Sequence, residues 1–385
     1  MRESFLPFSP PLIGDEEIAE VVDTLRSGWL TAGPKTQRFE ASFAELVGAP
    51  AALAVNSCTA ALHLALLASG VGEGDEVITT PMTFAASVNV IEHVGARPVL
   101  VDVEPDTLNI DTAGVAAAVT GRTRAVLPVH YAGHPVDLDA IRAVAEEHSL
   151  AVVEDAAHAL CAAYGGKPIG AGGNVAAFSF YATKNLTTGE GGMLTGPPEL
   201  LGKARVLSLH GMNRDAWRRY DESGTWFYAI ESPGFKYNMS EIQASLGLQQ
   251  LQKLEGFQQR RRAVVQRYDE AFAQLDALQT PATRPGVTHA HHLYVLRLRP
   301  GRLAIDRNTF IDELRARRIG TSVHFIPVHL HPYYRDKYGW QPDDFPIAYE
   351  NYQRMLSLPL NPALTEQDVE DVIGAVRDVV LGGGK

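Results

Sequence analysis

The sequence predicts an α/β fold in which a large domain with a mostly parallel sheet precedes a smaller α+β domain. Short apolar runs with strand character alternate with helical patterns between residues 51 and 154, which is typical of a parallel sheet with helices on both faces. One long helical pattern then covers residues 240–275, and strand and helix patterns resume beyond it. In a sheet of this kind, ligands bind at the carboxyl ends of the strands.

The elements of the large domain follow from the spacing of apolar residues. Helical spacing predicts two helices ahead of the first strand, one at residues 15–27, with Gly28 placed to end it, and one around residues 39–46. Strands are expected at residues 51–55, 76–79, 98–101, 125–129 and 151–154. The helices between these strands are expected at residues 59–69, 84–94 and 138–148.

The small domain is predicted in the same way. Strands are expected at residues 292–298 and 322–325, and helices at residues 308–317 and 365–380. The charged run at residues 258–262 of the long helix is interpreted as a solvated face rather than a phosphate-binding patch. We place the domain boundary after residue 250, so that the large domain covers residues 1–250 and the small domain covers residues 251–385.

Composition and charge argue against several classes of protein. The chain has 385 residues and a formal net charge of −11, which argues against nucleic acid or an anionic membrane surface as the main partner. Its two cysteines, Cys58 and Cys161, form no Cys-x-x-Cys motif and no disulfide framework, so a reducing cytoplasm is the expected compartment. The N-terminus is not signal-like, and no apolar run reaches about 18 residues, so we expect no membrane span.

The most informative residue is Lys184, which follows Ser179 and precedes a glycine-rich run at residues 189–192. Upstream, the apolar run at residues 151–153 leads into Glu154 and Asp155. A lysine can form a Schiff base with an aldehyde, a carboxylate can keep a pyridine nitrogen protonated, and a serine can bind a phosphate. Pyridoxal 5′-phosphate (PLP) requires these three groups. Their order and spacing therefore predict a PLP site.

Further residues at strand ends fit the same cofactor. Ser57 can cap a helix whose first amides, those of Thr59 and Ala60, would bind the phosphate together with the Ser179 hydroxyl; an ordinary capped helix is the alternative. Phe84 could stack on the pyridine ring, although a core phenylalanine fits the same pattern. His158 could reach the ring hydroxyl of PLP or be a structural histidine.

The sequence gives weaker support to three other kinds of site: a cysteine nucleophile, a metal site and a dinucleotide-binding site. Cys58 has no base arranged beside it, which favours a small packed residue over a nucleophile. Histidines cluster at residues 289–292 and 324–331, but no carboxylate pair accompanies them, so we expect no metal site. The glycines at residues 165–173 do not form the fingerprint that opens a dinucleotide-binding helix.

The chain resembles the DegT/DnrJ/StrS-type sugar-nucleotide aminotransferases, a family of fold-type-I PLP enzymes. The resemblance extends over essentially the whole chain and rests on motifs at residues 27–34, 57–63, 74–78, 154–159, 179–192, 234–244 and 357–360. It implies a seven-stranded, mostly parallel sheet in the large domain. It also implies PLP as the cofactor, with pyridoxamine phosphate as an intermediate form.

The resemblance also implies roles for individual residues. Lys184 matches the lysine that holds the cofactor, Asp155 its pyridine partner and Phe84 the stacking aromatic residue. His158 stands where many relatives have glutamine. Asn238 matches an asparagine that reaches the cofactor phosphate of a neighbouring subunit, which implies a homodimer with shared active sites.

For the substrates, the resemblance implies glutamate as the donor, released as 2-oxoglutarate, and a keto-sugar nucleotide as the acceptor. Thr31 and His324 match positions near the sugar. Residues 5–9 and 129–133 resemble most the enzymes that aminate a UDP-4-keto-pentose to UDP-4-amino-4-deoxy-L-arabinose. The amino sugar would serve cell-surface polysaccharide or lipid synthesis, or natural-product synthesis.

The chain departs from the family pattern at three positions. Cys58 replaces a common glycine, which slightly weakens the phosphate assignment. His291 replaces a tryptophan of the pentose enzyme and Asn361 replaces an aromatic residue or histidine, and these two departures leave the acceptor sugar open. A 3-keto or other nucleotide-linked hexose is the nearest alternative acceptor. A distant alternative function is that of a non-catalytic regulator that kept the fold. Some relatives carry histidine in place of the lysine and dehydrate the sugar, and Lys184 argues against that branch.

Overall fold

The computed structural model describes residues 2–213 and 227–382, and a seven-stranded sheet forms its centre. The strand order is β1-β9-β8-β5-β4-β2-β3. Every neighbouring pair from β8 to β3 is parallel, and only β9 runs against its neighbours β1 and β8. The strands of this sheet are β1 (Ala52–Val55), β2 (Glu76–Thr79), β3 (Arg97–Leu100), β4 (Thr123–Val126), β5 (Ala151–Asp155), β8 (Val175–Ser179) and β9 (Gly192–Thr195).

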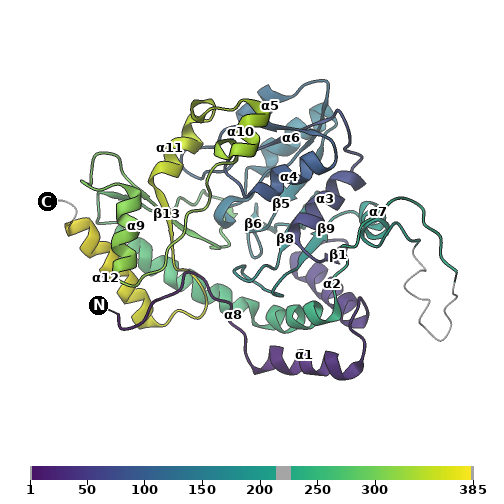
Figure 1. Cartoon of the computed structure of the whole chain (residues 1–385), viewed down its shortest axis with the longest axis horizontal. Helices are drawn as coiled ribbons and strands as arrows, with labels where there is room; N and C mark the ends of the chain where they lie inside the picture. The colour runs from purple at the N-terminus through teal and green to yellow at the C-terminus, as the bar shows by residue number, and fades with distance from the viewer. Residues whose placement is uncertain (1, 214–226, 383–385) are drawn as a thin grey trace.

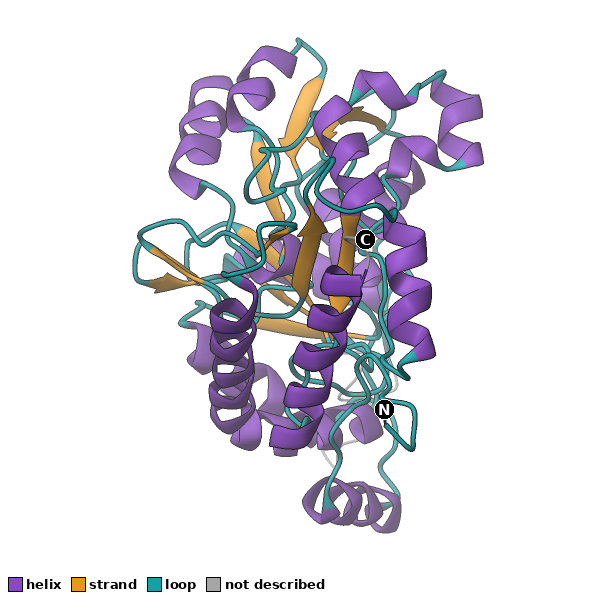
Figure 2. Cartoon of the chain, turned by 90° about the vertical axis from the view of Figure 1, so that its left-hand side faces the viewer, coloured by secondary structure: helices purple, strands orange, loops and turns teal. Residues whose placement is uncertain are grey.

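Helices cover both faces of the sheet, as Figure 2 shows with the strands in the middle of the molecule. The apolar residues of the strands point to both faces, and two buried clusters, one on each side, form the core of the large domain. The fold-type-I architecture expected from the sequence is therefore confirmed. The helices of this part are α1 (Asp15–Ser27), α2 (Pro34–Val47), α3 (Cys58–Ala68), α4 (Ala85–His93), α5 (Thr112–Ala118), η1 (Tyr131–Gly133), α6 (Leu138–His148) and α7 (Pro198–Ser208).

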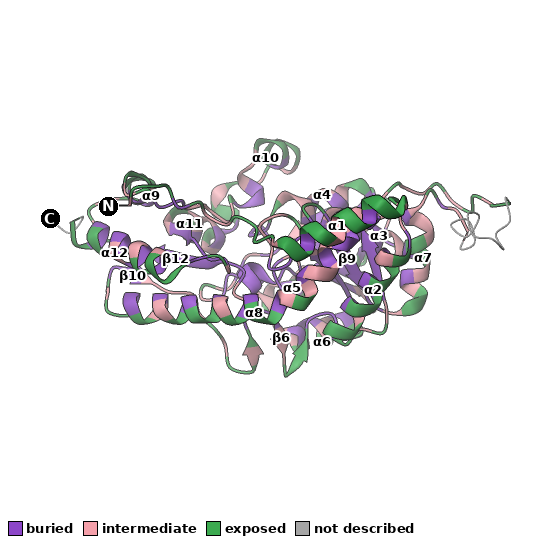
Figure 3. Ribbon diagram, turned by 90° about the horizontal axis from the view of Figure 1, so that it is seen from below, coloured by how far each residue is buried: buried purple, intermediate pink, exposed green. Residues whose placement is uncertain are grey.

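Helix α1 shows how closely the local sequence signals match the structure. It begins and ends where the apolar spacing predicts, and Gly28 terminates it in the left-handed conformation with φ of 75°. The helix packs on α8 (Glu241–Phe272), which Figure 1 shows as the long helix that runs along the lower side of the molecule. Much of α1 is coloured as exposed in Figure 3. Ile18, Val22 and Leu25 are among the exposed apolar residues of this helix.

Helix α8 joins the large sheet to the C-terminal part of the chain. It packs on α1 and α2 at one end and on α12 at the other. The expected domain boundary after residue 250 lies inside this helix, and the division into residues 1–250 and 251–385 stays a prediction. The remaining elements are β10 (Leu278–Gln279), β12 (Tyr294–Leu298), α9 (Arg307–Ala316), η3 (Val328–Leu330), α10 (Pro332–Tyr338), η4 (Pro342–Asp344), α11 (Pro346–Arg354), β13 (Met355–Leu358) and α12 (Glu366–Gly382).

The interpretation of residues 258–262 as a solvated helix face is wrong for two of its members. Gln258 and Arg261 are only 1% and 2% exposed. They lie three residues apart on the inner face of α8, where Gln258 donates to the Ala290 carbonyl at 2.9 Å and Arg261 to the Leu360 carbonyl at 2.8 Å. The inner face of α8 packs against the rest of the chain, so polar residues on this face donate hydrogen bonds to backbone carbonyls instead of to water.

The C-terminal part contains an antiparallel sheet with the order β10-β12-β13. The expected strand at residues 322–325 is wrong, because only Ser322 pairs, through an isolated bridge to Ser357 of β13. The segment leaves the outer edge of β13 after Ser322, because the His324 carbonyl accepts from the Tyr131 hydroxyl and the Phe325 ring stacks on His158 of the large domain. A third small sheet is formed by β6 (Ala163–Tyr164), β7 (Lys167–Pro168) and β11 (Val287–Thr288).

Within residues 2–213 and 227–382, no helix combines the length and the apolar character that crossing a bilayer requires.

Candidate active site

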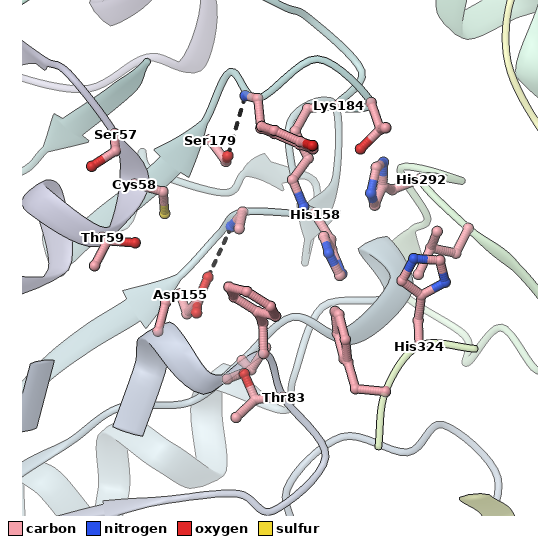
Figure 4. A pocket seen from close by; sticks show the side chains of 18 of the residues that line it. Ser57, Cys58, Thr59, Thr83, Asp155, His158, Ser179, Lys184, His292 and His324 are labelled. Carbon is pink, nitrogen blue, oxygen red and sulfur yellow. Dashed lines mark hydrogen bonds between the residues drawn. The ribbon is translucent and has the colours of Figure 1, made fainter. Parts of the chain in front are cut away.

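A cavity of about 510 Å³ lies at the carboxyl ends of β5 and β8. Seven of the ten predicted site residues line it: Thr59, Phe84, Asp155, His158, Ser179, Lys184 and His324. Figure 4 shows the labelled side chains of this set converging on one space from different elements. The position follows from the topology, because the carboxyl ends of parallel strands meet at the same edge of the sheet.

Asp155 ends strand β5, and hydrogen bonds hold both of its carboxylate oxygens. Oδ2 accepts from the Ser87 hydroxyl at 2.7 Å, and Oδ1 accepts from the Ala157 amide at 3.1 Å. The side chain is 5% exposed. Such a carboxylate can face a protonated ring nitrogen without changing its own orientation.

Lys184 lies in the turn after β8, where its amide donates to the Tyr181 carbonyl at 2.9 Å. Its side chain is half-buried and lines the cavity. Burial lowers the pKa of its amine from 10.5 to about 8, and the negative charge of Asp155 partly opposes this shift. The neutral, nucleophilic amine is therefore available close to physiological pH.

The turn between β1 and α3 is where the sequence predicts the phosphate-binding site. Ser57 caps α3, and its Oγ accepts from the Ala60 amide at 3.1 Å, so this amide is directed at the cap rather than into the cavity. Thr59 and Ser179 line the cavity on either side of the turn. Cys58 packs beside them, and burial raises the pKa of its thiol well above 9, as expected for a packed residue rather than a nucleophile.

Aromatic rings and imidazoles form the opposite wall. His158 lies between His292, at a centroid distance of 4.4 Å, and Phe325, on which it stacks at 5.7 Å. Its Nδ1 is buried and has no hydrogen-bond partner among the described residues. Burial, reinforced by the charge of Lys184, lowers the pKa of His158 well below 6.5, so the ring is neutral at pH 7.

His324 comes from the segment that was expected to be a strand. Its Nδ1 lies 2.9 Å from the Ser357 hydroxyl, and burial and Lys184 lower its pKa to about 4. Phe84 is 64% exposed at the cavity and lies 6.0 Å from Phe325.

The sequence analysis missed several residues that line the cavity or support a residue of its lining. Ser87 supports Asp155, and His292 pairs through Nδ1 with the Asn185 side-chain oxygen at 3.0 Å. Phe8 and Phe325 also line the space. His292 was considered only as a metal ligand, and the one signal that could have found it is its place at the start of an expected strand.

The structure does not bring three predicted residues into this cavity. Ala60 is buried in α3, Thr31 is exposed after α1, and Asn238 pairs through its backbone with Val55 of its own chain. For the metal alternative, the described parts of the chain contain no group of three or more histidine, cysteine, aspartate or glutamate side chains arranged to hold an ion.

The residues present fit PLP. A half-buried amine, a fixed carboxylate, two hydroxyls beside a helix N-terminus and an exposed aromatic ring surround one cavity. The buried and unpaired Nδ1 of His158 gives independent support, because buried polar atoms rarely stay without a partner and a polar ligand would supply one.

Comparisons with known proteins show the family to which the chain belongs. The model of the DegT/DnrJ/EryC1/StrS aminotransferase family matches residues 11–377. The chain is 55% identical over 383 residues to the spore coat polysaccharide biosynthesis protein SpsC of Bacillus subtilis (strain 168), an alignment that covers 99% of this chain and 98% of SpsC.

Solved structures are similar over almost the whole length. Spr1654 from Streptococcus pneumoniae has been solved in a PLP form and a PMP form, with TM-scores of 0.91 and 0.92 and identities of 37% and 38%. Each comparison covers 98% of this chain and 99% of the other. The sugar aminotransferase CalS13 from Micromonospora echinospora gives a TM-score of 0.87 at 32% identity and covers 97% of this chain and 99% of its own.

Proposed function

The chain belongs to the DegT/DnrJ/EryC1/StrS aminotransferase family, and on this basis we propose that it moves an amino group from glutamate to a UDP-linked 4-keto sugar. Family and neighbours already make it a PLP-dependent sugar aminotransferase that uses the PLP and pyridoxamine phosphate forms of one cofactor. The donor, the acceptor and the residue roles are our proposal. The observation that carries them is the meeting of Lys184, Asp155 and Ser179 in one cavity.

We assign each side chain a role from its position. Asp155 faces the pyridine nitrogen, Ser179 and the start of α3 at Thr59 and Ala60 hold the phosphate, and Phe84 lies against the ring. When bound, PLP supplies an electron sink for the carbanion formed at the donor's α-carbon. The Ala60 amide donates to Ser57 Oγ in this structure. The proposal therefore requires that this amide donates to the phosphate instead, or to both acceptors.

Lys184 carries the proton in this proposal. Its Nζ takes the proton from the α-carbon of glutamate and delivers it to the cofactor side, and the reverse path serves the sugar. An amine with a pKa of about 8 suits both directions, because general acid and base catalysis works best when the pKa lies near the working pH. His158, neutral at pH 7, offers Nδ1 to the ring hydroxyl of the cofactor.

The acceptor sugar would lie on the open side of the cavity, near His324. We propose Thr31 and Asn238 as contributions from a second subunit, because neither reaches the cavity of its own chain. Exposed apolar side chains support a homodimer: Ile18 and Leu25 on α1, Leu30 after it, and Phe84 and Tyr181 at the cavity. A second copy that covered these side chains would also close the site from solvent.

The product would enter polysaccharide synthesis at the cell surface. This part of the proposal rests on the printed name of SpsC, a spore coat polysaccharide biosynthesis protein. The reaction itself is placed in the cytoplasm, where the free cysteines Cys58 and Cys161 would stay reduced.

A substrate screen tests the proposal. Purified protein is incubated with PLP, glutamate and, separately, a UDP-4-keto-pentose, a UDP-4-keto-hexose and a 3-keto-hexose nucleotide, and the products are identified by mass spectrometry. We expect an amino sugar from a UDP-4-keto substrate together with 2-oxoglutarate. Lys184→Ala should abolish product, whereas Lys167→Ala, which removes an exposed lysine on β7, should not. Product only from the 3-keto-hexose would refute the 4-keto assignment.

A further inference from the structure

We propose that Thr83 and Ser87 form a hydrogen-bond relay that positions the Asp155 carboxylate against the pyridine nitrogen of PLP. This inference rests on the proposed role of Asp155 and adds two positioning residues to it. Neither hydroxyl is assigned to the cofactor itself.

The direction of the relay follows from counting protons. Ser87 Oγ donates its one proton to Asp155 Oδ2 at 2.7 Å. Thr83 Oγ1 lies 2.7 Å from the same Ser87 oxygen. Since the Ser87 proton is already used, Thr83 is the donor in this second bond, and the chain runs from Thr83 through Ser87 to the carboxylate.

Burial gives the relay its strength. Ser87 is 0%, Thr83 2% and Asp155 5% exposed, so water does not compete for these bonds. Hydrogen bonds to a charged acceptor are stronger than those between neutral groups. A first hydroxyl that is polarised by a second donates more strongly, because hydrogen bonds in a chain reinforce one another.

One alternative is that Ser87 bonds to Asp155 only because a buried hydroxyl needs an acceptor. Other buried serines in this chain argue against it. Ser208 in α7 and Ser245 in α8 donate to carbonyls three residues earlier in their own helices, both at 2.8 Å. Ser87 is the third residue of α4 and could use a carbonyl of the preceding turn in the same way. It donates instead to a carboxylate 68 positions away, on another element.

The relay also ties two parts of the cofactor site together. Thr83 directly precedes Phe84, which N-caps α4 and is the proposed stacking ring. The loop that positions the Phe84 ring therefore also positions the Asp155 carboxylate, through Thr83 and Ser87. A shift of this loop would move both groups at once.

Five variants of the full-length protein test the inference: Ser87→Ala, Thr83→Val, Thr83→Ser, Asp155→Asn as a reference, and Ser245→Ala as a matched control. Each is stripped of PLP and titrated with it, while affinity and the visible absorption band of bound PLP are recorded. We expect Ser87→Ala to weaken PLP by about tenfold, the value of one hydrogen bond to a charged group, and to move the band toward that of Asp155→Asn. Ser245→Ala loses an equally buried hydroxyl and should match the wild type in both.

Thr83→Val should weaken PLP binding by about threefold, as expected for the loss of a hydrogen bond between neutral groups, and should move the band in the same direction. Thr83→Ser keeps the hydroxyl and should show the wild-type affinity and band. This pair keeps the inference testable where Ser87→Ala fails to fold. Wild-type affinity and band in Ser87→Ala, or an equal effect of Ser245→Ala, would overturn the relay alone. An unchanged band and affinity in Asp155→Asn would overturn the role of Asp155 and the relay with it, whichever sugar the enzyme accepts.

Discussion

The lysine amine at the centre of the proposed chemistry owes its reactivity to where it is buried. Burial lowers the pKa of Lys184 to about 8, and Asp155 limits the shift by favouring the charged form. In the proposed site the same carboxylate also faces the ring nitrogen of the cofactor, so one residue would serve two purposes. A fully apolar wall would lower the pKa of Lys184 further, but it would offer the ring nitrogen no partner.

A pH dependence of cofactor capture follows from this pKa. Below about pH 8 the Lys184 amine carries a proton and has no lone pair with which to attack an aldehyde; above it the neutral amine predominates. We therefore expect the rate at which PLP-free protein binds PLP covalently to rise with pH and to level off above about pH 8. Stopped-flow absorbance at a series of pH values measures this rate. A midpoint near 10.5, the ordinary value for lysine, would contradict the buried setting of the amine.

Arg261 shows at the residue scale why sequence pattern can mislead. Its run of charged and amide residues resembles a solvated face, yet its guanidinium donates to buried carbonyls of the C-terminal part. Burial lowers the pKa of this guanidinium to about 10, which still leaves it charged at pH 7. Arg260 and Arg262 of the same run pair with Glu366 and Glu255 near the surface, as the pattern suggests.

At the scale of elements, the turns at the strand ends were predictable, while contacts between distant segments were not. Asp155, Ser179 and Thr59 each follow an apolar strand, and parallel strands bring such positions together without further information. Ser87 lies in the first turn of α4, and His292 and Phe325 lie in irregular segments outside the helices and strands, so only the packed structure reveals them. The segment 322–325 has strand character, but His324 and Phe325 contact Tyr131 and His158 of the large domain instead of continuing along β13.

Strand β9 imposes a close approach on the proposed phosphate-binding turn, which gives a prediction for Gly192. A Cβ at this position would lie 2.5 Å from the Ser57 carbonyl carbon and 2.6 Å from the Cys58 nitrogen. Gly192→Ala should therefore displace the turn, weaken PLP and lower the free energy of unfolding by about 1–3 kcal/mol, the usual cost of overpacking. Urea unfolding of PLP-free protein and a PLP titration measure the two effects.

Gly202 in α7 provides the control for this substitution. A Cβ there meets nothing within 4 Å, so Gly202→Ala should leave PLP binding unchanged and raise stability by about 0.5–1 kcal/mol through helix propensity. Unchanged PLP affinity in Gly192→Ala would show that the turn between β1 and α3 does not hold the phosphate.

For the whole molecule, a single chain leaves the proposed site incomplete. Phe84 and Tyr181 are 64% and 48% exposed beside the cavity, while Asn238 lies outside it. The backbone of Asn238 is fixed against Val55 of β1, and within the described parts of the chain its side chain makes only a local bond to the Met239 carbonyl at 3.2 Å. An isologous dimer would account for all three, since each subunit would cover the exposed rings of the other and present Asn238 to its phosphate.

Mixed dimers test this sharing directly. Lys184→Ala lacks the amine and Asn238→Ala lacks the proposed phosphate contact, so each variant alone should have little activity. If Asn238 serves the partner's site, a hybrid of the two variants contains one site with both residues intact. Statistical exchange of subunits should then restore about one quarter of the wild-type activity, because half the dimers are hybrids and each has one good site. Light scattering confirms the dimer, and Lys184→Ala mixed with itself is the control. If the mixture is no more active than the Asn238→Ala protein that it contains, the hybrids have no intact site. Asn238 and Lys184 of the same chain would then serve one site, and the shared arrangement would be refuted.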